Sequence, residues 1–384
     1  MMSQINLRNL SNENEDGAPD IVGVSTFSAT SYFVPPVGNT AQRPQNSQPG
    51  DLRFNTDSAS LEYYRGDTLG WSHIEMTSPD LGGGTGSNKG TGARGIRGGG
   101  QTPSGTDVID YFTISTLGDA EDFGDITPGG RFGISPGASR TRGILAGGAT
   151  PSRLANIDYI TISSTGSSVT FGSLMSGNAT TGASSQTRAF TMAGSTPSYT
   201  NVIQYVTIQS TGNAEDFGDM STQNFESFRV LASSTRAVTT GGYTSPTWDR
   251  TMEYITISTT GNSIDFGEMT RDAYAPGAGG NSTRGIIAGG YTPSAQSDID
   301  YITIASTGNS TDWGADLIQS SSGPLATASD PTRLCIFGHS TGAPSGNVIQ
   351  YLQIATTGVA SDDFGDLTGN CTNAAGFSNA HGGL

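Results

Sequence analysis

A single phrase recurs along most of this chain and restricts the folds that the chain can adopt. An apolar segment around a tyrosine, IDYITI in its most regular form, occurs six times at intervals of 46 to 50 residues. A second aromatic residue, mostly in a setting similar to D-F-G-D, and an arginine recur at the same step. The tyrosines are Tyr111, Tyr159, Tyr205, Tyr254, Tyr301 and Tyr351; the second aromatic residues are Phe123, Phe171, Phe217, Phe266, Trp313 and Phe364; the arginines are Arg94, Arg142, Arg188, Arg236, Arg284 and Arg333. Residues 94–384 therefore consist of six copies of one unit, the signature of a repeat architecture.

Each copy predicts four short β-strands. In the fifth copy, an apolar run after Arg284 ends in glycines, and the segment from Ile299 alternates apolar with polar residues, as a half-buried strand does. Thr307, Gly308 and Asn309 then predict a tight turn, with Gly and Asn at positive φ. A strand around the second aromatic residue and a segment of small residues complete the unit. No copy has apolar residues at helical spacing over a useful length, so we expect an all-β fold.

The copy length and the two chain ends favour a closed ring. Four antiparallel strands in about 48 residues match one blade of a β-propeller. A β-solenoid is the alternative, although its coils are usually shorter and its ends need capping units. Here the first copy starts at Arg94 without a small-residue strand, whereas residues 369–383 form an extra strand of that type. We expect this last segment to pair beside residues 94–99 and to close a six-bladed propeller that leaves no long edge exposed.

Composition excludes several classes of protein. Glycine occurs 55 times in 384 residues and only 14% of residues are charged; the regularly placed Ile, Tyr and Phe favour a packed, turn-rich β protein over a disordered chain. A net charge of −16 disfavours binding to nucleic acid, because phosphate binding requires clustered Lys and Arg. We expect no secretory signal at the N-terminus and no membrane insertion, since no segment approaches the ~20 apolar residues that a spanning helix requires.

The strand pattern resembles a known repeat family. A Gly-Gly pair ends one strand of several copies and is followed by the tyrosine strand and then by an aromatic residue; the pairs are Gly147 and Gly148, Gly241 and Gly242, and Gly289 and Gly290. This order resembles kelch repeats, whose blades form propellers. The twelve residues from Tyr301 to Trp313 are longer than a kelch blade usually has, and Ala193-Gly194 and Phe337-Gly338 break the pair. The phrase IDYITIASTGN with DFGDL is similar, more closely, to kelch-like repeats in virion proteins of tailed bacteriophages, especially marine ones, over about three-quarters of the chain.

The first ninety residues differ from the repeats. Residues 1–79 predict an extended segment followed by a small β-meander, and residues 80–93 are a Gly-rich linker of the flexible kind. The stretch GDLRFNT, with LEYY and a tryptophan after it, resembles a short module of phage tail-fibre and appendage proteins. Such a meander buries little apolar area alone, so we expect Phe54, Tyr63, Tyr64 and Trp71 to attach it to a partner subunit or to the virion. A self-contained small core, or packing on the propeller, is the alternative.

No constellation of residues indicates catalysis or metal binding. The three histidines, His73, His339 and His381, form no ligand motif, and the two cysteines, Cys335 and Cys371, suit buried fillers better than a disulfide framework. We therefore expect no metal and no cofactor.

Pairs of aspartates recur along the chain, and glycosidases use two carboxylates in catalysis. The pairs are Asp122 and Asp125, Asp216 and Asp219, and Asp363 and Asp366. Their recurrence favours a structural role, either at a turn or beside the repeated arginine. One Arg per copy looks like the arginine cluster of sialidases, but the S-x-D-x-G-x-x-W box of that family is absent. We interpret the repeated arginine as a clamp between blades and expect no enzymatic activity.

The segment after each T-P-S varies between copies, which suits a rigid scaffold that carries binding loops. Four aromatic residues lie in or beside these segments: Tyr199, Tyr243, Trp248 and Tyr291. Exposed aromatic rings stack on sugars or cap protein contacts, so these residues are the candidate ligand-binding set; local packing is the alternative for each of them.

The resemblance and the loops together imply a function. We expect a structural protein of a phage virion, a tail fibre or appendage, assembled in the host cytoplasm and present as a homo-oligomer on the particle. Its N-terminal region would contact other virion proteins, and its propeller would bind host-surface glycan, with avidity from many copies. The alternatives are a purely structural capsid-decoration or baseplate subunit and a glycan-cleaving enzyme.

Overall fold

The computed structural model describes residues 35–57, 60–73, 92–175, 181–195, 199–221, 228–244, 246–339 and 346–384. The chain divides into two compact units, Met1–Thr77 and Ser78–Leu384. The predicted linker, residues 80–93, lies outside the described residues except for its last two. Within the described ranges, no helix has the length and apolar character needed to cross a membrane.

The N-terminal unit contains a four-stranded sheet, in the order β1-β2-β3-β4, and one short 3₁₀ helix. Its elements are β1 (Val37–Gly38), the helix Thr40–Gln42, β2 (Leu52–Asn55), β3 (Ser60–Tyr64) and β4 (Trp71–His73). One face of this sheet is built around a buried carboxylate, Glu62, which accepts hydrogen bonds from Arg43, Arg53 and Asn55. Those donors keep the pKa of the Glu62 carboxyl below its ordinary value, the hydrogen bond from Arg43 being the main cause.

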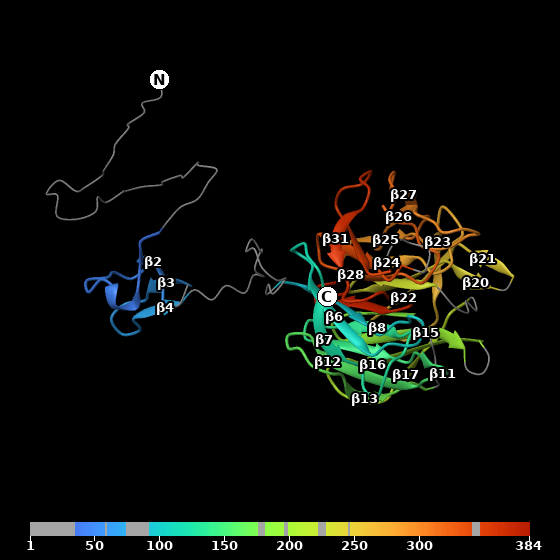
Figure 1. Ribbon diagram of the computed structural model, residues 1–384, viewed down its shortest axis with the longest axis horizontal. Coiled ribbons are helices and arrows are strands. Elements are labelled where there is room, and N and C mark those ends of the chain that lie inside the picture. The colour runs from blue at the N-terminus through green and yellow to red at the C-terminus, as the bar shows by residue number, and fades with distance from the viewer. Residues whose placement is uncertain are drawn as a thin grey trace, which may run out of the picture. The chain divides into compact units, whose positions relative to one another are not determined.

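The repeats fold into six four-stranded antiparallel sheets, which resemble propeller blades and which we number one to six in chain order (Figure 1). Sheet one contains β32 (Ala375–Ser378), β5 (Arg94–Gly98), β6 (Val108–Thr113) and β7 (Glu121–Asp125). Sheet two contains β8 (Ser135–Ala138), β9 (Arg142–Ala146), β12 (Asn156–Thr161) and β13 (Val169–Ser173). Sheet three contains β14 (Thr181–Ser184), β15 (Arg188–Ser195), β16 (Tyr199–Thr207) and β17 (Glu215–Asp219).

The remaining three sheets have the same strand order. Sheet four contains β18 (Arg229–Ala232), β19 (Arg236–Thr240), β22 (Thr251–Thr256) and β23 (Ile264–Glu268). Sheet five contains β24 (Gly277–Gly280), β25 (Arg284–Ala288), β26 (Ile299–Thr303) and β27 (Thr311–Asp312). Sheet six contains β28 (Ala326–Ser329), β29 (Arg333–Phe337), β30 (Val348–Gln353) and β31 (Asp362–Asp366). Among the described residues, two small hairpins lie outside these sheets: β10 (Ala149–Thr150) with β11 (Ser152–Arg153), and β20 (Gly242–Thr244) with β21 (Thr247–Asp249).

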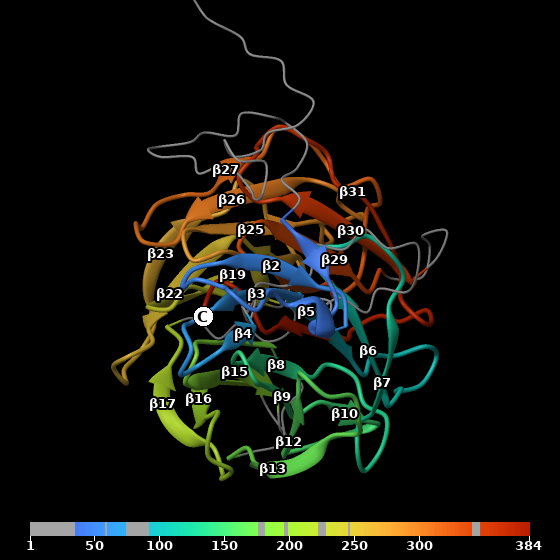
Figure 2. The same cartoon turned by 90° about the vertical axis from the view of Figure 1, so that its left-hand side faces the viewer.

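Sheet one combines the two ends of the repeat region, as the sequence predicts. Strand β32 pairs antiparallel with β5, and Phe377 lies opposite Ile96 in this register. The first strand of each sheet contacts the first strands of neighbouring sheets, and β32 contacts both β28 and β8. Figure 2 shows these sheets arranged in chain order around one centre.

The apolar core is divided among the junctions between sheets. Six clusters of buried side chains occur, and each combines residues of two neighbouring sheets, the pair of six and one included. The second aromatic residue of every copy is buried in one of them. The apolar faces of one sheet are thus buried against the neighbouring sheets. Each copy depends on its neighbours for an apolar core, as in other repeat architectures.

The repeated arginines connect neighbouring sheets. Each guanidinium lies over the tyrosine ring of its own copy, with centroid distances from 4.6 to 5.1 Å. Each also donates to a backbone carbonyl of the next sheet: Arg94 to Ile162, Arg142 to Ile208, Arg188 to Ile257, Arg236 to Ile304, Arg284 to Ile354 and Arg333 to Ile114. This confirms the predicted clamp.

In the fifth copy, the turn before the second aromatic residue differs from the prediction at its asparagine. Gly308 has a φ of 151°, but Asn309 is not among the residues with positive φ. The Asn309 carboxamide oxygen accepts instead from the backbone N–H of Glu268 in the preceding sheet. The asparagine at this position therefore serves the neighbouring sheet, where the sequence pattern indicated only a local turn.

The recurring acids have a local structural role where their partners are seen. The Asp122 carboxylate accepts from the N–H of Gly124, and Asp312 accepts from Gly314. Gly124 allows two sheets to approach closely, since a Cβ on it would lie 2.6 Å from the backbone of Gly166. Both predicted fillers, Cys335 and Cys371, are buried free thiols.

Candidate functional site

Sheet four carries an extra hairpin beside sheet five. Strands β20 and β21 extend the connection between the second and third strands of sheet four, and Tyr243 lies opposite Trp248 in their register. The hairpin is held to the segment that enters sheet five, because Gly242 donates to the Ala273 carbonyl and Ala273 donates to the Asp249 carbonyl. The variable segment of the fourth copy thus forms a hairpin in the part that the structure describes.

Four aromatic rings meet where this hairpin contacts sheet five. Tyr243 packs edge-to-face against Tyr274 with centroids 6.2 Å apart, and Trp248 packs against Tyr291 at the same separation. Tyr274 and Tyr291 exchange backbone hydrogen bonds of 3.1 and 2.9 Å. We call Tyr243, Trp248, Tyr274 and Tyr291 the aromatic corner. All four side chains are half-buried, so each ring keeps part of its surface in solvent.

The polar atoms of the aromatic corner differ from those of the repeated aromatic residues. The repeated Tyr111 and Tyr205 donate their phenols to Glu121 and Glu215, and the indole of Trp313 donates to the Val359 carbonyl, all at 2.8 Å. By contrast, the three phenols and the indole of the aromatic corner donate to no residue that the structure describes.

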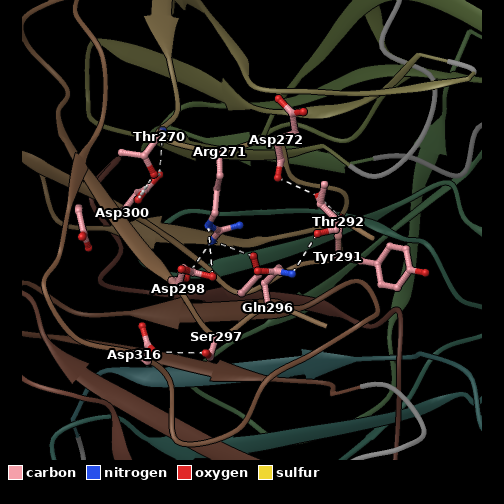
Figure 3. Close-up of polar contacts among 12 residues, drawn as sticks. Thr270, Arg271, Asp272, Tyr291, Thr292, Gln296, Ser297, Asp298, Asp300 and Asp316 are labelled. Atoms are coloured by element: carbon pink, nitrogen blue, oxygen red, sulfur yellow. Dashed lines mark hydrogen bonds and ion pairs between the residues drawn. The ribbon is translucent and has the colours of Figure 1, made fainter. Parts of the chain in front are cut away.

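A network of polar contacts holds the loop that carries Tyr291. Arg271 donates to the backbone carbonyls of Gly289 and Asp298 at 3.1 and 2.8 Å, and its Nε lies 3.8 Å from the Asp298 carboxylate. The hydroxyl of Thr292 donates to the Asp272 carbonyl at 2.8 Å. Figure 3 shows these contacts, with the ring of Tyr291 directed away from them. The ring is thus presented on a braced loop.

Three of the four predicted ligand-binding residues are brought together, namely Tyr243, Trp248 and Tyr291. Tyr199 begins β16 of sheet three, and its side chain lies outside the described part of the structure. Tyr274 is a member that the sequence analysis missed. The sequence feature that could have identified Tyr274 is its position as an aromatic residue at the start of a segment of small residues. Most other copies have no aromatic residue at this position.

The predicted attachment residues are divided between the two faces of the N-terminal sheet. Phe54 lies opposite Leu61, and Tyr63 lies opposite Leu52, so these four residues share one face. Leu52 and Tyr63 are exposed by 41% and 36%.

Tyr64 and Trp71 lie on the other face, the face of Glu62. Their rings are 5.4 Å apart, and Arg53 lies over Trp71. The N-terminal sheet therefore has one apolar face in solvent and one polar, packed face.

The groups considered for catalysis are scattered. No cluster of three or more His, Cys, Asp or Glu side chains that could hold a metal ion occurs among the described residues. His339 is fully buried, with its Nε2 2.9 Å from the Gln350 side chain, and burial lowers its pKa to about 4. It is therefore neutral at pH 7.

Comparison of the chain with known protein families found no match, and comparison with curated proteins found none either.

Proposed function

We propose that the six repeat sheets form a closed β-propeller that binds carbohydrate at the aromatic corner between sheets four and five. The observation that carries this proposal is the meeting of four half-buried rings whose polar atoms donate to no residue in the part of the chain that the structure describes. Aromatic faces accept the C–H face of a sugar ring, and free phenol and indole donors suit its hydroxyls.

The closed propeller is supported by contacts that sheet six makes with sheet one. Arg333 donates to the Ile114 carbonyl at 3.0 Å, and Gly118 donates to the Phe364 carbonyl at 2.9 Å. The same two kinds of contact join the other neighbouring sheets, for example Arg94 with Ile162. A closed ring holds its loops rigidly, which lowers the cost of ordering a binding site.

The corner is distinguished from the scaffold by its irregularity. The aromatic residues that recur in every copy are buried in the junctions between sheets, where packing explains them. None of the four corner residues belongs to that recurring set. Within the described residues this corner alone gathers such rings on a scaffold that otherwise repeats itself, and such a feature favours recognition over stability.

The test is binding of the purified protein to an array of bacterial surface oligosaccharides, followed by titration of those retained. We expect W248A and Y291A each to weaken binding at least about 10-fold, the loss typical of a stacked aromatic contact. Y63A, which removes an exposed ring from the N-terminal sheet, is the matched control and leaves affinity unchanged. Equal binding by W248A, Y291A and wild type, or no retained saccharide, would overturn the proposal.

We further propose, from the resemblance noted above, that the protein is part of a phage virion and attaches through its N-terminal unit. The apolar face with Leu52, Phe54, Leu61 and Tyr63 supports this assignment, because a patch of this kind usually marks an interface. Imaging of intact particles with a labelled antibody tests the setting. Labelling of a tail fibre or appendage supports adsorption, whereas a propeller face covered by capsid or tail protein contradicts it.

A further inference from the structure

A cavity lies at the centre of the repeat unit. Its volume is about 90 Å³, and residues from the first strands of all six sheets line it. One water occupies roughly 10–15 Å³ on this measure, so the cavity has room for an ion of several heavy atoms. Each lining strand is the end strand of its sheet, so it has backbone N–H groups outside the ladder.

The C-terminal segment lies against the lining strands at one end. His381 contacts the Ala138 carbonyl at 2.9 Å and the Ser184 hydroxyl at 3.2 Å. A Cβ on Gly382 or Gly383 would collide with the backbone of Ala232 or Ser184. Burial lowers the pKa of His381 to about 4, so it carries no charge at pH 7.

The charge inside the cavity comes from one residue. Arg229 occupies a position that Ser135, Thr181, Gly277 and Ala326 hold in other sheets. Its Nε donates to the Leu325 carbonyl at 3.1 Å and its Nη1 to the Phe228 carbonyl at 3.0 Å.

No carboxylate pairs with Arg229 in the described structure, and the lining residues include no Asp or Glu. Desolvation lowers the pKa of Arg229 to about 10, and the nearby phenol of Tyr274 opposes this shift. A desolvated guanidinium without a counter-ion is costly, and an oxyanion provides both the missing charge and bidentate acceptors.

We propose that the central cavity binds an oxyanion, with Arg229 as its cationic ligand and backbone N–H groups of the first strands as further donors. The ligand class is a carboxylate, sulfate or phosphate group. It comes either from a free small anion or from an acidic sugar, and the cavity suits either source. This inference does not depend on carbohydrate binding at the aromatic corner.

The test measures the Tm of the full chain at constant ionic strength. In one series, sodium chloride is exchanged for sulfate, phosphate or acetate. In a second series, galacturonate is compared with the uncharged sugar galactose. We expect the wild-type Tm to rise with oxyanion concentration, because binding to the folded state stabilises it. R229Q should weaken the apparent affinity at least about 10-fold. R140Q, which removes an exposed arginine, is the matched control and retains the response.

The outcomes separate the two sources. A response to sulfate, phosphate or acetate indicates a free anion, and a response to galacturonate alone indicates an acidic sugar. W248A, which changes the aromatic corner, should keep the Tm response to sulfate. A failure of carbohydrate binding at the aromatic corner and a failure of oxyanion binding in the central cavity are therefore distinguishable. If R229Q does not fold, crystals of the wild type soaked in selenate should give an anomalous peak beside Arg229. Equal responses of R229Q and wild type, no response to any anion, or an empty cavity in selenate would overturn the proposal.

Discussion

Residues at the junctions between the sheets recur in every copy, whereas residues in the connecting loops differ between copies. At the junctions, an arginine over a tyrosine and a donor to the next sheet's carbonyl recur in all six copies. Among the loops that the structure describes, only the corner between sheets four and five gathers four aromatic rings. Repetition identifies residues that hold the fold, and departure from repetition is the basis on which we propose a binding site.

The largest effect should follow removal of residues 374–384, which deletes β32 from sheet one. Loss of this strand exposes the apolar cluster between sheets one and two and the edge of β5. We expect the free energy of unfolding to fall by more than about 5 kcal/mol, in the range of exceptional changes. Deletion of residues 1–73 is the control, and differential scanning calorimetry of the repeat unit should show no change. A shortened chain that melts like the wild type would contradict the role of β32.

A buried ion pair gives the next effect. Arg131 donates to the Asp158 carboxylate at 2.5 Å, and both side chains are at most 1% exposed. R131L leaves a buried carboxylate unpaired, so we expect a loss of about 3–5 kcal/mol in urea unfolding. The double variant R131L/D158L should recover most of it, because the uncompensated charge is gone. Equal stability of the single and double variants would refute this explanation.

The repeated clamp is tested by R236Q. Arg236 donates to the carbonyls of Ile304 and Ala305 at 3.1 and 2.8 Å and lies 4.6 Å from the centroid of Tyr254. Loss of a charged donor should cost about 1.5–3 kcal/mol by chemical denaturation. R250Q is the matched control, since the pair of Arg250 with Glu268 is half-exposed and contributes about 0–1 kcal/mol. Similar losses in both variants would count against the clamp.

Acid should weaken the fold through its buried histidines. The pKa of His339 is lowered to about 4 in the folded protein because it is buried, so the unfolded chain binds the proton more tightly. The contribution of His339 is therefore complete above about pH 6.5 and decreases as the pH falls, by about 2 kcal/mol at pH 5. H339Q replaces the imidazole with an amide that does not titrate, and it should remove this part of the pH dependence. Parallel pH profiles for H339Q and wild type would contradict the assignment.

The junctions could be predicted from the sequence because their residues recur. The strand order, the pairing of β32 with β5 and the arginine clamp all follow from positions that repeat. The hydrogen bond from Glu268 to Asn309 was not predicted, because Glu268 lies in another copy and local turn chemistry does not show such a contact.

The aromatic corner was only partly predictable. Tyr243, Trp248 and Tyr291 stood out as aromatic residues in variable loops, but Tyr274 lay in a segment of small residues. Arg229 was missed for a related reason, since its meaning depends on the cavity that six separate strands enclose. A residue unlike its counterparts in the other copies was the signal in both cases.

The most direct test of the central claim is a crystal structure of the repeat unit with an oligosaccharide retained on the array, together with the binding stoichiometry from calorimetry. The account predicts one saccharide per chain, with a sugar ring stacked on Trp248 or Tyr291 between sheets four and five. Equivalent saccharides at several junctions, or one bound away from this corner, would contradict it.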